Sequence, residues 1–349
     1  MSVTHKQIAD KVGVSEASVS VALGSSGRIA AKTKARILQA AEELGYRPNK
    51  LVQGIQTGKS MTVGVLLHCS GDPYEDNLFR GIYKVLAQND YVPIVLSGCD
   101  ELEELSQVHA LIDRRVDGLL LRPFKAILWE DFLPEILGRD IPVVSVDIEM
   151  QARFPEIDFV GTDETLGTAQ AADALLNAGH RRLGVVTTKH ASAEGVKYKD
   201  SLYYRHHAFQ SYVSGKQGVS CSYVEAFWAQ GIHGYESALN LLSQEDRPTG
   251  VFVTMDHLAV GVYHAARELG LRIPEDLSVV GYANNPISQA LAPQLSTIHQ
   301  HADEVGSKAA GLLLERIQGR PEGDDRRQIL IEPEWVSRDS VAPPPQPKR

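Results

Sequence analysis

The stretch THKQIADKVGVSEASVSVAL, residues 4–23, decides the fold of the N-terminal part of the chain. Thr4 and Gln7 have the spacing of a capping box, which predicts a helix that begins directly after Thr4. Gly13 is expected to end this helix, and Ser15 is expected to cap a second helix that continues to the end of the stretch. Two short helices joined by a turn that contains glycine form a helix-turn-helix unit.

A third helix is predicted over residues 31–44, with Gly45 as its C-terminal stop. The apolar residues at core spacing in the three helices are Ile8, Ala9, Val12, Val19, Ala22 or Leu23, Ile37, Leu38, Ala41 and Leu44. Such a unit is either a small structural bundle or a DNA-binding head. The short hydroxyl side chains of Ser15, Ser18 and Ser20 favour the second interpretation, because they let a helix approach a phosphate backbone closely.

The charge of the chain is distributed unevenly. Its 349 residues carry a net charge of −9, but residues 1–60 contain nine Lys or Arg against four acids, a net charge of +5. The remaining residues therefore carry −14. A basic head on an acidic body indicates that the head meets a polyanion, although a solvated surface would give the same count.

Several protein classes are excluded by composition. The chain has no apolar run long enough to cross a membrane, and its N-terminus lacks the apolar segment of a signal peptide. Its three cysteines, Cys69, Cys99 and Cys221, are widely spaced and odd in number. We therefore expect a cytoplasmic protein without a disulfide framework.

Two segments of the head resemble the DNA-binding domain of the LacI/GalR (lac-repressor) family. They are TxxxIAxxVGVSxxSVS at residues 4–20 and KTKARIxxAAEELGYRPN at residues 32–49. The resemblance implies that the second helix enters the major groove of double-stranded operator DNA. It also implies that residues 47–60 form a hinge helix that wedges apolar side chains into the minor groove. Without DNA we expect a flexible linker there, because a short helix containing Gly54 is unstable alone.

The resemblance assigns roles to single residues of the head. Base reading falls on Glu16, Ala17 and Val21. Further DNA contacts fall on Thr4, Ser15, Ser18, Ser20, Arg28, Thr33, Tyr46 and Asn49, and on Val52 and Ile55 in the hinge.

Two of these residues depart from the family pattern. Val21 stands where many members have Arg, so a bidentate contact with guanine is missing. Ile55 stands where the wedge is usually Leu, and its branched Cβ makes insertion stiffer. Both departures predict an operator that differs from the family's usual sequence.

The rest of the chain alternates apolar runs with helix-like stretches. The predicted strands form a first series at 61–67, 91–97, 117–121 and 141–147, and a second at 158–162, 182–188, 250–254 and 277–283. This alternation is typical of parallel sheets covered by helices, and two series predict two doubly wound lobes. Ligands in such folds bind outside the carboxyl ends of the strands, here between the lobes.

Several body segments resemble the periplasmic-binding-protein-like effector domain of the same family. Among them are IPVVSVD (141–147), AGHRRLGVV (178–186) and MDHLAVGVYHAARELGLRIPEDLSVVGYANN (255–285). The expected organisation is a helix-turn-helix domain at 1–46, a hinge at 47–60, an effector-binding and dimerisation domain at 61–340, and a disordered Pro-rich tail at 341–349. Within the body, lobe 1 is expected at about 61–157 and 293–322, and lobe 2 at about 158–292 and 323–340.

The resemblance places Asp147, Arg205 and Asp256 at positions that hold the hydroxyls of a sugar-like ligand. The chemistry agrees, because a carboxylate accepts from two adjacent hydroxyls and a guanidinium offers a planar set of donors. Each residue could instead be a surface charge or a helix cap, and Asp256 opens a predicted helix. Weaker effector candidates are His68, Asp72, Tyr74, Trp228 and Gln300, of which Trp228 is equally well read as a core residue.

Ala283, Asn284 and Asn285 stand where many family members have paired aspartates. This departure changes the local charge, so an effector identity cannot be carried over from the family. We expect no cofactor and no metal site, because His206–His207 and His299–His301 lack further ligands at suitable spacing.

Enzyme functions find no support, because the chain has no nucleophile elbow, phosphate loop, dinucleotide fingerprint or zinc-protease motif. We expect a homodimeric, ligand-responsive transcriptional repressor that binds a pseudo-palindromic operator and is switched by a small sugar or sugar derivative. The alternatives are a non-catalytic sugar-binding protein and a DNA binder that does not respond to a ligand.

Overall fold

The computed structural model describes most of the chain in two compact units. They comprise residues 1–60 and 61–349, and each is considered by itself. The residues described are 3–24, 28–47, 58–68, 72–98, 101–122, 129–148, 154–192, 199–227, 231–319 and 326–346.

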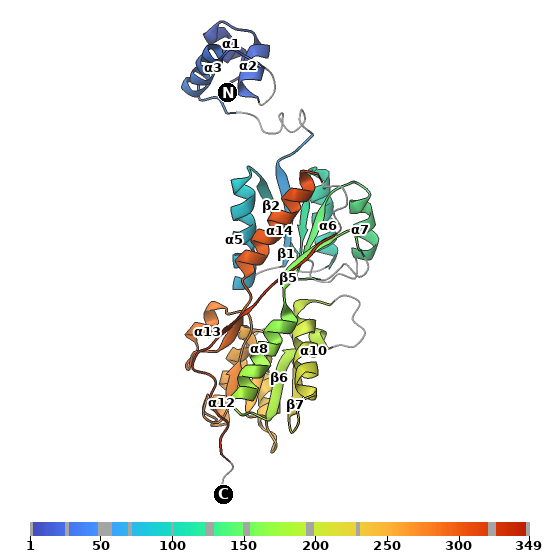
Figure 1. The fold of residues 1–349 in the computed structure, drawn as a ribbon, viewed down its shortest axis with the longest axis vertical. Coiled ribbons are helices and arrows are strands. Elements are labelled where there is room, and N and C mark those ends of the chain that lie inside the picture. Colours follow the sequence, from blue (N-terminus) through green and yellow to red (C-terminus); the bar gives the residue numbers. More distant parts are fainter. Residues whose placement is uncertain are drawn as a thin grey trace. The chain divides into compact units, whose positions relative to one another are not determined.

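The N-terminal unit is a bundle of three helices (Figure 1). They are α1 (His5–Val12), α2 (Glu16–Leu23) and α3 (Ala31–Glu43). The capping box of Thr4 and Gln7 is present, and Gly13 ends α1 with a left-handed φ of 75°. The Ser15 hydroxyl accepts from the backbone N–H of Ser18 at 3.2 Å and so caps α2. The local signals therefore place the first two helices correctly.

A small core joins these helices. It consists of Ile8, Ala9, Val12, Val19, Ala22, Ile37, Ala40 and Ala41. The prediction for Leu38 was wrong, since this side chain is 45% exposed. Ala40 is buried instead, together with Ile37 and Ala41, on the face of α3 that packs against α1 and α2.

The first lobe of the body contains a parallel six-stranded sheet in the order β11-β5-β4-β3-β1-β2. Its strands are β1 (Thr62–His68), β2 (Val92–Gly98), β3 (Leu119–Leu121), β4 (Val143–Val146), β5 (Asp158–Thr162) and β11 (Gln328–Ile331). Helices α5 (Pro73–Gln88) and α14 (Ala302–Ile317) cover one face, and α6 (Glu101–Asp113) and α7 (Trp129–Leu137) cover the other.

The second lobe contains a parallel four-stranded sheet in the order β7-β6-β8-β9. Its strands are β6 (Arg182–Thr188), β7 (Ser220–Ala226), β8 (Gly250–Val253) and β9 (Ser278–Val280). One face is covered by α8 (Glu164–Asn177) and α10 (Ser201–Ser214), and the other by α11 (Gly231–Leu242) and α12 (Asp256–Glu268). The short helices α9 (Lys189–Ser192) and α13 (Pro286–Ala290) and the antiparallel pair β10 (Thr297–His299) and β12 (Glu334–Val336) complete the body.

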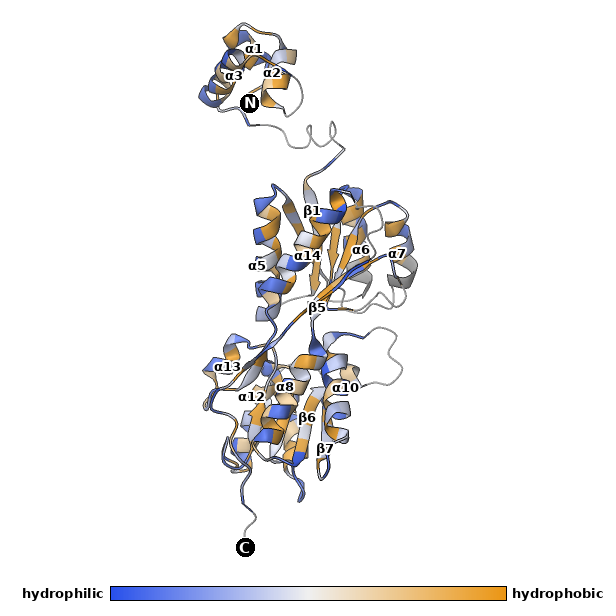
Figure 2. Cartoon of the chain, in the orientation of Figure 1, coloured by the Kyte–Doolittle hydropathy of each residue, from blue (hydrophilic) through white to orange (hydrophobic). Residues whose placement is uncertain are grey.

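Both lobes are doubly wound, as the alternation of apolar runs predicts. The inner strands of the two sheets are largely hydrophobic (Figure 2) and buried, which is typical of strands covered on both faces. The edge strand β7 is mostly exposed.

The predicted lobe boundaries need correction at three places. Residues 158–162 and 328–331 form strands of the first sheet and not of the second. Residues 297–299, which we placed in lobe 1, pair with β12 and continue from the second sheet through a bridge between Val280 and Ser296. The chain therefore passes between the lobes near residues 163, 300 and 332.

A buried ion pair explains why β5 belongs to the first lobe. Arg316 on α14 donates to both carboxylate oxygens of Asp158 at 2.6 and 2.8 Å. Asp158 also accepts from the backbone N–H of Arg327 at 2.8 Å, which brings β11 beside β5. Spacing along the sequence carries no signal of this long-range pairing.

The C-terminal tail is also more ordered than expected. Ala342 accepts hydrogen bonds through its carbonyl from Ser278 at 3.0 Å and pairs with the His180 ring at 2.9 Å. Val341 packs against the core of the second lobe. The predicted disordered tail from residue 341 is thus wrong for its first residues, which dock along this lobe.

Helices α5 and α14 approach one another closely through glycine. A Cβ added at Gly306 would lie 2.1 Å from the carbonyl oxygen of Leu78, and one added at Gly81 would lie 2.0 Å from that of Asp303. At Gly311, on the same helix α14, an added Cβ meets no atom within 4 Å.

We therefore expect Gly306→Ala to lower the free energy of unfolding by about 1–3 kcal/mol, because the two backbones must separate. Gly311→Ala is the matched control and should raise stability by up to about 1 kcal/mol through helix propensity. Urea titration followed by circular dichroism measures both. Equal effects of the two substitutions would contradict the close approach.

Candidate functional site

The residues predicted to contact DNA lie mainly on the surface of the N-terminal unit. On α2, Glu16, Ala17 and Ser20 are exposed and Val21 is half-buried. Of the others, Thr4, Ser15 and Arg28 are exposed, and Ser18, Thr33 and Tyr46 are half-buried. Asn49, Val52 and Ile55 lie outside the described residues.

Several of these hydroxyl groups already have a structural role. The side chains of Ser15 and Ser18 share a hydrogen bond of 2.9 Å at the start of α2. The Tyr46 hydroxyl pairs with the His5 ring at 2.7 Å and so joins the end of α3 to α1. These bonds fix the shape of the head.

The body contains a cavity of about 180 Å³ between its two lobes. The lining residues come from strands β5 and β11, from the position directly after β4, and from the starts of α8 and α10. They are Asp147, Phe159, Thr162, Asp163, Glu164, Thr165, Ser201, Tyr204, Gln328 and Leu330. The predicted residue Asp147 is therefore at the cavity, outside the carboxyl end of its strand.

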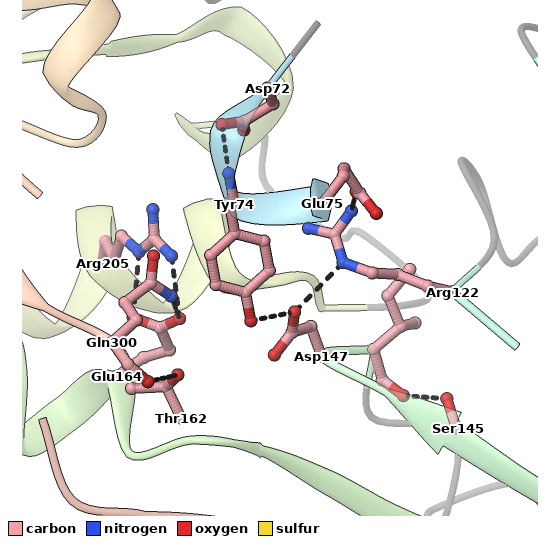
Figure 3. A network of polar contacts seen from close by, with 11 residues as sticks. Asp72, Tyr74, Glu75, Arg122, Ser145, Asp147, Thr162, Glu164, Arg205 and Gln300 are labelled. Carbon is pink, nitrogen blue, oxygen red and sulfur yellow. Dashed lines mark hydrogen bonds and ion pairs between the residues drawn. The ribbon is translucent and has the colours of Figure 1, made fainter. Parts of the chain in front are cut away.

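A network around Asp147 forms the first side of the site (Figure 3). Asp147 has a left-handed φ of 58° and is only 6% exposed. Its Oδ2 accepts from the Tyr74 hydroxyl at 2.6 Å and from Arg122 Nε at 3.0 Å. Its Oδ1 is buried and has no hydrogen-bond partner. Because buried acceptors are normally paired, this oxygen is available for a donor from a ligand.

Glu75 extends this network and was not predicted. Its carboxylate forms an ion pair with Arg122 Nη1, while its Oε2 is buried without a partner. Burial raises the pKa of Glu75 to about 7, although Arg122 opposes the shift. Burial lowers the pKa of Arg122, but the charges of Glu75 and Asp147 outweigh this effect and raise it.

A second network surrounds Arg205. This side chain is 4% exposed and donates to both oxygens of Glu164 at 2.9 Å, and to the carbonyl oxygen of Thr254 at 2.9 Å. Its guanidinium carbon lies 4.1 Å from the centre of the Tyr282 ring. Gln300 donates to Glu164 Oε1 at 3.1 Å. Figure 3 shows the Tyr74 ring between this network and Asp147.

The prediction that Asp256 holds ligand hydroxyls does not fit its position. It is fully buried, and its two oxygens accept from Thr297 Oγ1 and from the backbone N–H of Asn285, each at 2.7 Å. It does not cap α12 with its side chain either. Burial raises its pKa to about 7. Asp256 therefore positions the loop that begins at Gly281.

Asp72 is a helix cap and also connects the lobes. Its Oδ1 accepts from the backbone N–H of Tyr74 at 3.0 Å, at the start of α5. The same oxygen accepts from Asn285 Nδ2, on the second lobe, at 3.2 Å. This is a direct side-chain hydrogen bond between the two lobes at the cleft.

Two effector candidates cannot be placed, because the His68 side chain and all of Trp228 lie outside the described residues.

His206 was not an effector candidate but lies beside Arg205. It is buried with an unpartnered Nδ1 and packs edge-on against Tyr223, and burial lowers its pKa to about 4.

The sequence contained signals for the residues that were missed. Arg122 directly follows a predicted strand, which is the position where ligand-binding residues gather. Glu164 lies two residues after the predicted strand at 158–162 and was not predicted as a site residue. Its pairing with Arg205 could not be predicted, because the two residues are 41 positions apart.

Within the described ranges, no cluster of three or more His, Cys, Asp or Glu side chains could hold a metal ion. No described helix combines the length and apolar character needed to span a membrane.

Two known families match separate parts of the chain. Residues 4–49 match the family of bacterial regulatory proteins, lacI family. Residues 172–341 match the periplasmic binding protein-like domain.

Full-length relatives are repressors. The chain is 30% identical to the HTH-type transcriptional repressor PurR of Edwardsiella ictaluri over 349 residues, 98% of each chain. It is 30% identical to the ribose operon repressor of Haemophilus influenzae over 346 residues, 97% of this chain and 98% of the relative.

Solved structures share the fold. The lac repressor dimer bound to operator and the anti-inducer ONPF matches with a TM-score of 0.83 at 22% identity, over 98% of this chain and 100% of the other. A LacI family transcriptional regulator from Enterococcus faecium with bound ribose matches with a TM-score of 0.69 at 29% identity, over 81% of this chain and 99% of the other.

The raised pKa of Glu75 should make the free energy of unfolding depend on pH. Its folded-state pKa of about 7 lies above the ordinary value of 4.5, so the folded protein binds this proton more tightly. The contribution is complete below pH 4.5 and is lost as the pH rises through 7. The unfolding free energy should therefore decrease by on the order of 2 kcal/mol from this group between pH 5.5 and 8.

Glu75→Gln should flatten this dependence in urea titrations at the two pH values. Asp256 has a pKa shift in the same direction and remains in the variant, so part of the slope persists. Asp76→Asn, an exposed neighbour on α5, is the matched control. Asp76 contributes to the Glu75 shift less than burial and Arg122 do, so this variant should change the slope only slightly. An unaltered slope in Glu75→Gln would contradict the assignment.

Proposed function

The chain belongs to the lacI family of bacterial regulatory proteins, and we propose that it represses transcription by binding an operator as a homodimer that a small metabolite switches. The family consists of regulators and not of enzymes, and the chain is not an enzyme. The N-terminal unit is the proposed DNA-binding part, and the cavity between the lobes is the proposed effector site.

Exposure and charge support the assignment of the head. The first 60 residues carry a net charge of +5, and α2 exposes the three short or polar side chains Glu16, Ala17 and Ser20. A helix with such a surface can lie in the major groove, where base edges are read. Two heads related by dimer symmetry would require a pseudo-palindromic operator.

One observation carries the proposal of an effector site. Asp147 Oδ1 is a buried acceptor without a partner at a cavity between two lobes. Leaving a buried polar atom unpaired costs about 1–3 kcal/mol, which a ligand donor would recover on binding. A small hydroxyl-rich molecule supplies such donors, and ribose is bound to the Enterococcus faecium regulator.

Closure of the lobes is the proposed switch. A ligand that binds one lobe arrangement more tightly shifts the equilibrium toward it, and only this difference in affinity matters. A coupling of about 1–3 kcal/mol changes operator occupancy about 5- to 150-fold. The bond between Asp72 and Asn285 is one contact that exists only when these parts of the lobes meet.

The proposal is tested by selecting operator sequences from random DNA with the purified chain. Binding to the selected sequence is then followed by fluorescence anisotropy with and without a panel of sugars. Deleting residues 1–60 should abolish DNA binding and leave sugar binding intact. A chain that binds sugar but never DNA is a sugar-binding protein, whereas DNA binding that no metabolite alters indicates a regulator without an effector.

Arg28 is exposed in the head and is proposed to contact phosphate. Arg28→Ala should weaken binding to specific and unrelated DNA by similar factors and reduce the slope of log affinity against log salt by about 1. Arg139→Ala, which removes an exposed charge from the first lobe, is the control and should change neither quantity. A loss confined to the specific operator would show that Arg28 reads sequence instead.

Asn285→Asp tests the contact between the lobes. The new carboxylate would face Asp72 and cost on the order of 1–2 kcal/mol through repulsion. Amide hydrogen exchange at the start of α5 should then be about tenfold faster, because this contact opens more often.

Asn284→Asp is the matched control for this experiment. Asn284 Oδ1 accepts from Arg338 Nη2 at 2.6 Å, so a carboxylate at this position gains a cation as its partner. Exchange in this variant should stay at the parent rate. Equal acceleration in both variants would contradict a specific contact between residues 72 and 285.

A further inference from the structure

The cavity between the lobes is lined by acidic residues and not by basic ones. Asp147, Asp163 and Glu164 are among its described lining residues, which include no Lys, Arg or His. Just behind them, Glu75 is buried against Arg122, and Asp72 caps the neighbouring helix α5. The site thus holds five carboxylates against the two guanidinium groups of its networks, those of Arg122 and Arg205.

Both arginines already have their charges compensated. Arg205 uses two nitrogens for Glu164 and a third for the Thr254 carbonyl, and its face lies against Tyr282. Arg122 is shared between Glu75 and Asp147. Neither arginine offers the uncompensated fork of donors that recognises phosphate or carboxylate.

The unsatisfied atoms of the site are acceptors. Asp147 Oδ1 and Glu75 Oε2 are buried carboxylate oxygens without hydrogen-bond partners. Asp147 and Glu75 are 6% and 4% exposed, respectively, so bulk water screens them poorly. These oxygens would attract hydroxyl or ammonium donors and repel an anion.

We propose, on the basis of the effector function proposed above, that the effector carries hydroxyl or amine donors and no negative charge. Neutral sugars and amino sugars fit this cleft, and sugar phosphates and sugar acids are excluded from it. Asp147 accepts from the ligand directly, and Glu75 sets the charge preference through Arg122.

The role assigned to Glu75 can be tested separately from that of Asp147, because Glu75 compensates the charge of Arg122. Removing the charge of Glu75 leaves Arg122 paired with Asp147 alone. Glu75→Gln should therefore lower the affinity for a cationic ligand about tenfold, which is the effect of one pKa unit of interaction between charges. The same substitution should reduce the discrimination against anions. Asp76→Asn removes an equal charge from the exposed side of α5 and should change neither.

The test uses the full chain and does not require the effector to be known. A bacterial metabolite extract is separated on an anion-exchange column at pH 8, and both fractions are added to the protein in thermal unfolding measurements. Glucose, glucosamine, gluconate and glucose 6-phosphate serve as defined probes of one ring size with different charges. The proposal predicts stabilisation by the unretained fraction, and by neutral or amine-bearing probes where a defined probe binds.

Stabilisation by the retained fraction alone, or none by the unretained fraction, would overturn the proposal. Stabilisation by gluconate or glucose 6-phosphate, without stabilisation by glucose or glucosamine, would also overturn the proposal. For any neutral or amine-bearing compound that binds the parent chain, Asp147→Asn should abolish the stabilisation, whereas Asp76→Asn should keep it.

Operator binding in the same fractions separates this proposal from the function on which it rests. If an anionic fraction releases or strengthens DNA binding, the charge assignment fails and the regulator remains. If the unretained fraction stabilises the protein without altering its DNA binding, the charge assignment holds and the regulatory function fails.

Discussion

The body depends on the buried contacts that join its three lobe crossings around Glu164. At the first crossing, the backbone N–H of Asp163 donates to Ile331 O of the third crossing at 2.9 Å, and Thr162 Oγ1 donates to Gln300 O of the second at 3.3 Å. Gln300 also donates to Glu164, which holds Arg205 from the second lobe. These contacts tie together the segments that link the lobes, so we infer that the lobes move relative to one another about this point. The cavity lies beside this joint. A small displacement caused there by a bound molecule is therefore amplified into a larger movement at the far ends of the lobes.

Much of the fold follows from local signals. The caps at Thr4 and Ser15 each involve residues three positions apart, and the apolar runs of the strands are continuous in the sequence. The lobe boundaries could not be predicted in this way, because β5 and β11 join the first sheet through a carboxylate that pairs with Arg316, 158 positions later. Leu38 was misplaced for a related reason. Helical spacing allows two adjacent faces, and only the packing of α3 selects the one with Ala40.

The location of the candidate site could be predicted from the sequence, but the hydrogen-bond and ion-pair partners of its residues could not. Asp147 follows an apolar strand and does line the cavity, whereas Asp256 satisfies the same rule and is closed off by Thr297 and Asn285. Arg205 was expected to offer its donors to the ligand, but it forms a buried ion pair with Glu164. A rule based on strand ends identifies the edge of the sheet where polar residues gather. Which of them remain unpaired depends on contacts between residues far apart in the chain, and these decide the chemistry of the ligand.

The proposed function requires that ligand binding in the cleft between the lobes is coupled to operator binding by the N-terminal unit. This coupling can be measured as the affinity for one stabilising compound, by titration calorimetry, without DNA and with saturating operator. Thermodynamic linkage requires the ratio of these affinities to equal the factor by which the compound changes operator affinity. Coupling of the two sites predicts a ratio that differs from one by about 5- to 150-fold and agrees in both directions. The same affinity with and without operator would contradict it, since a ligand indifferent to DNA cannot regulate binding to it.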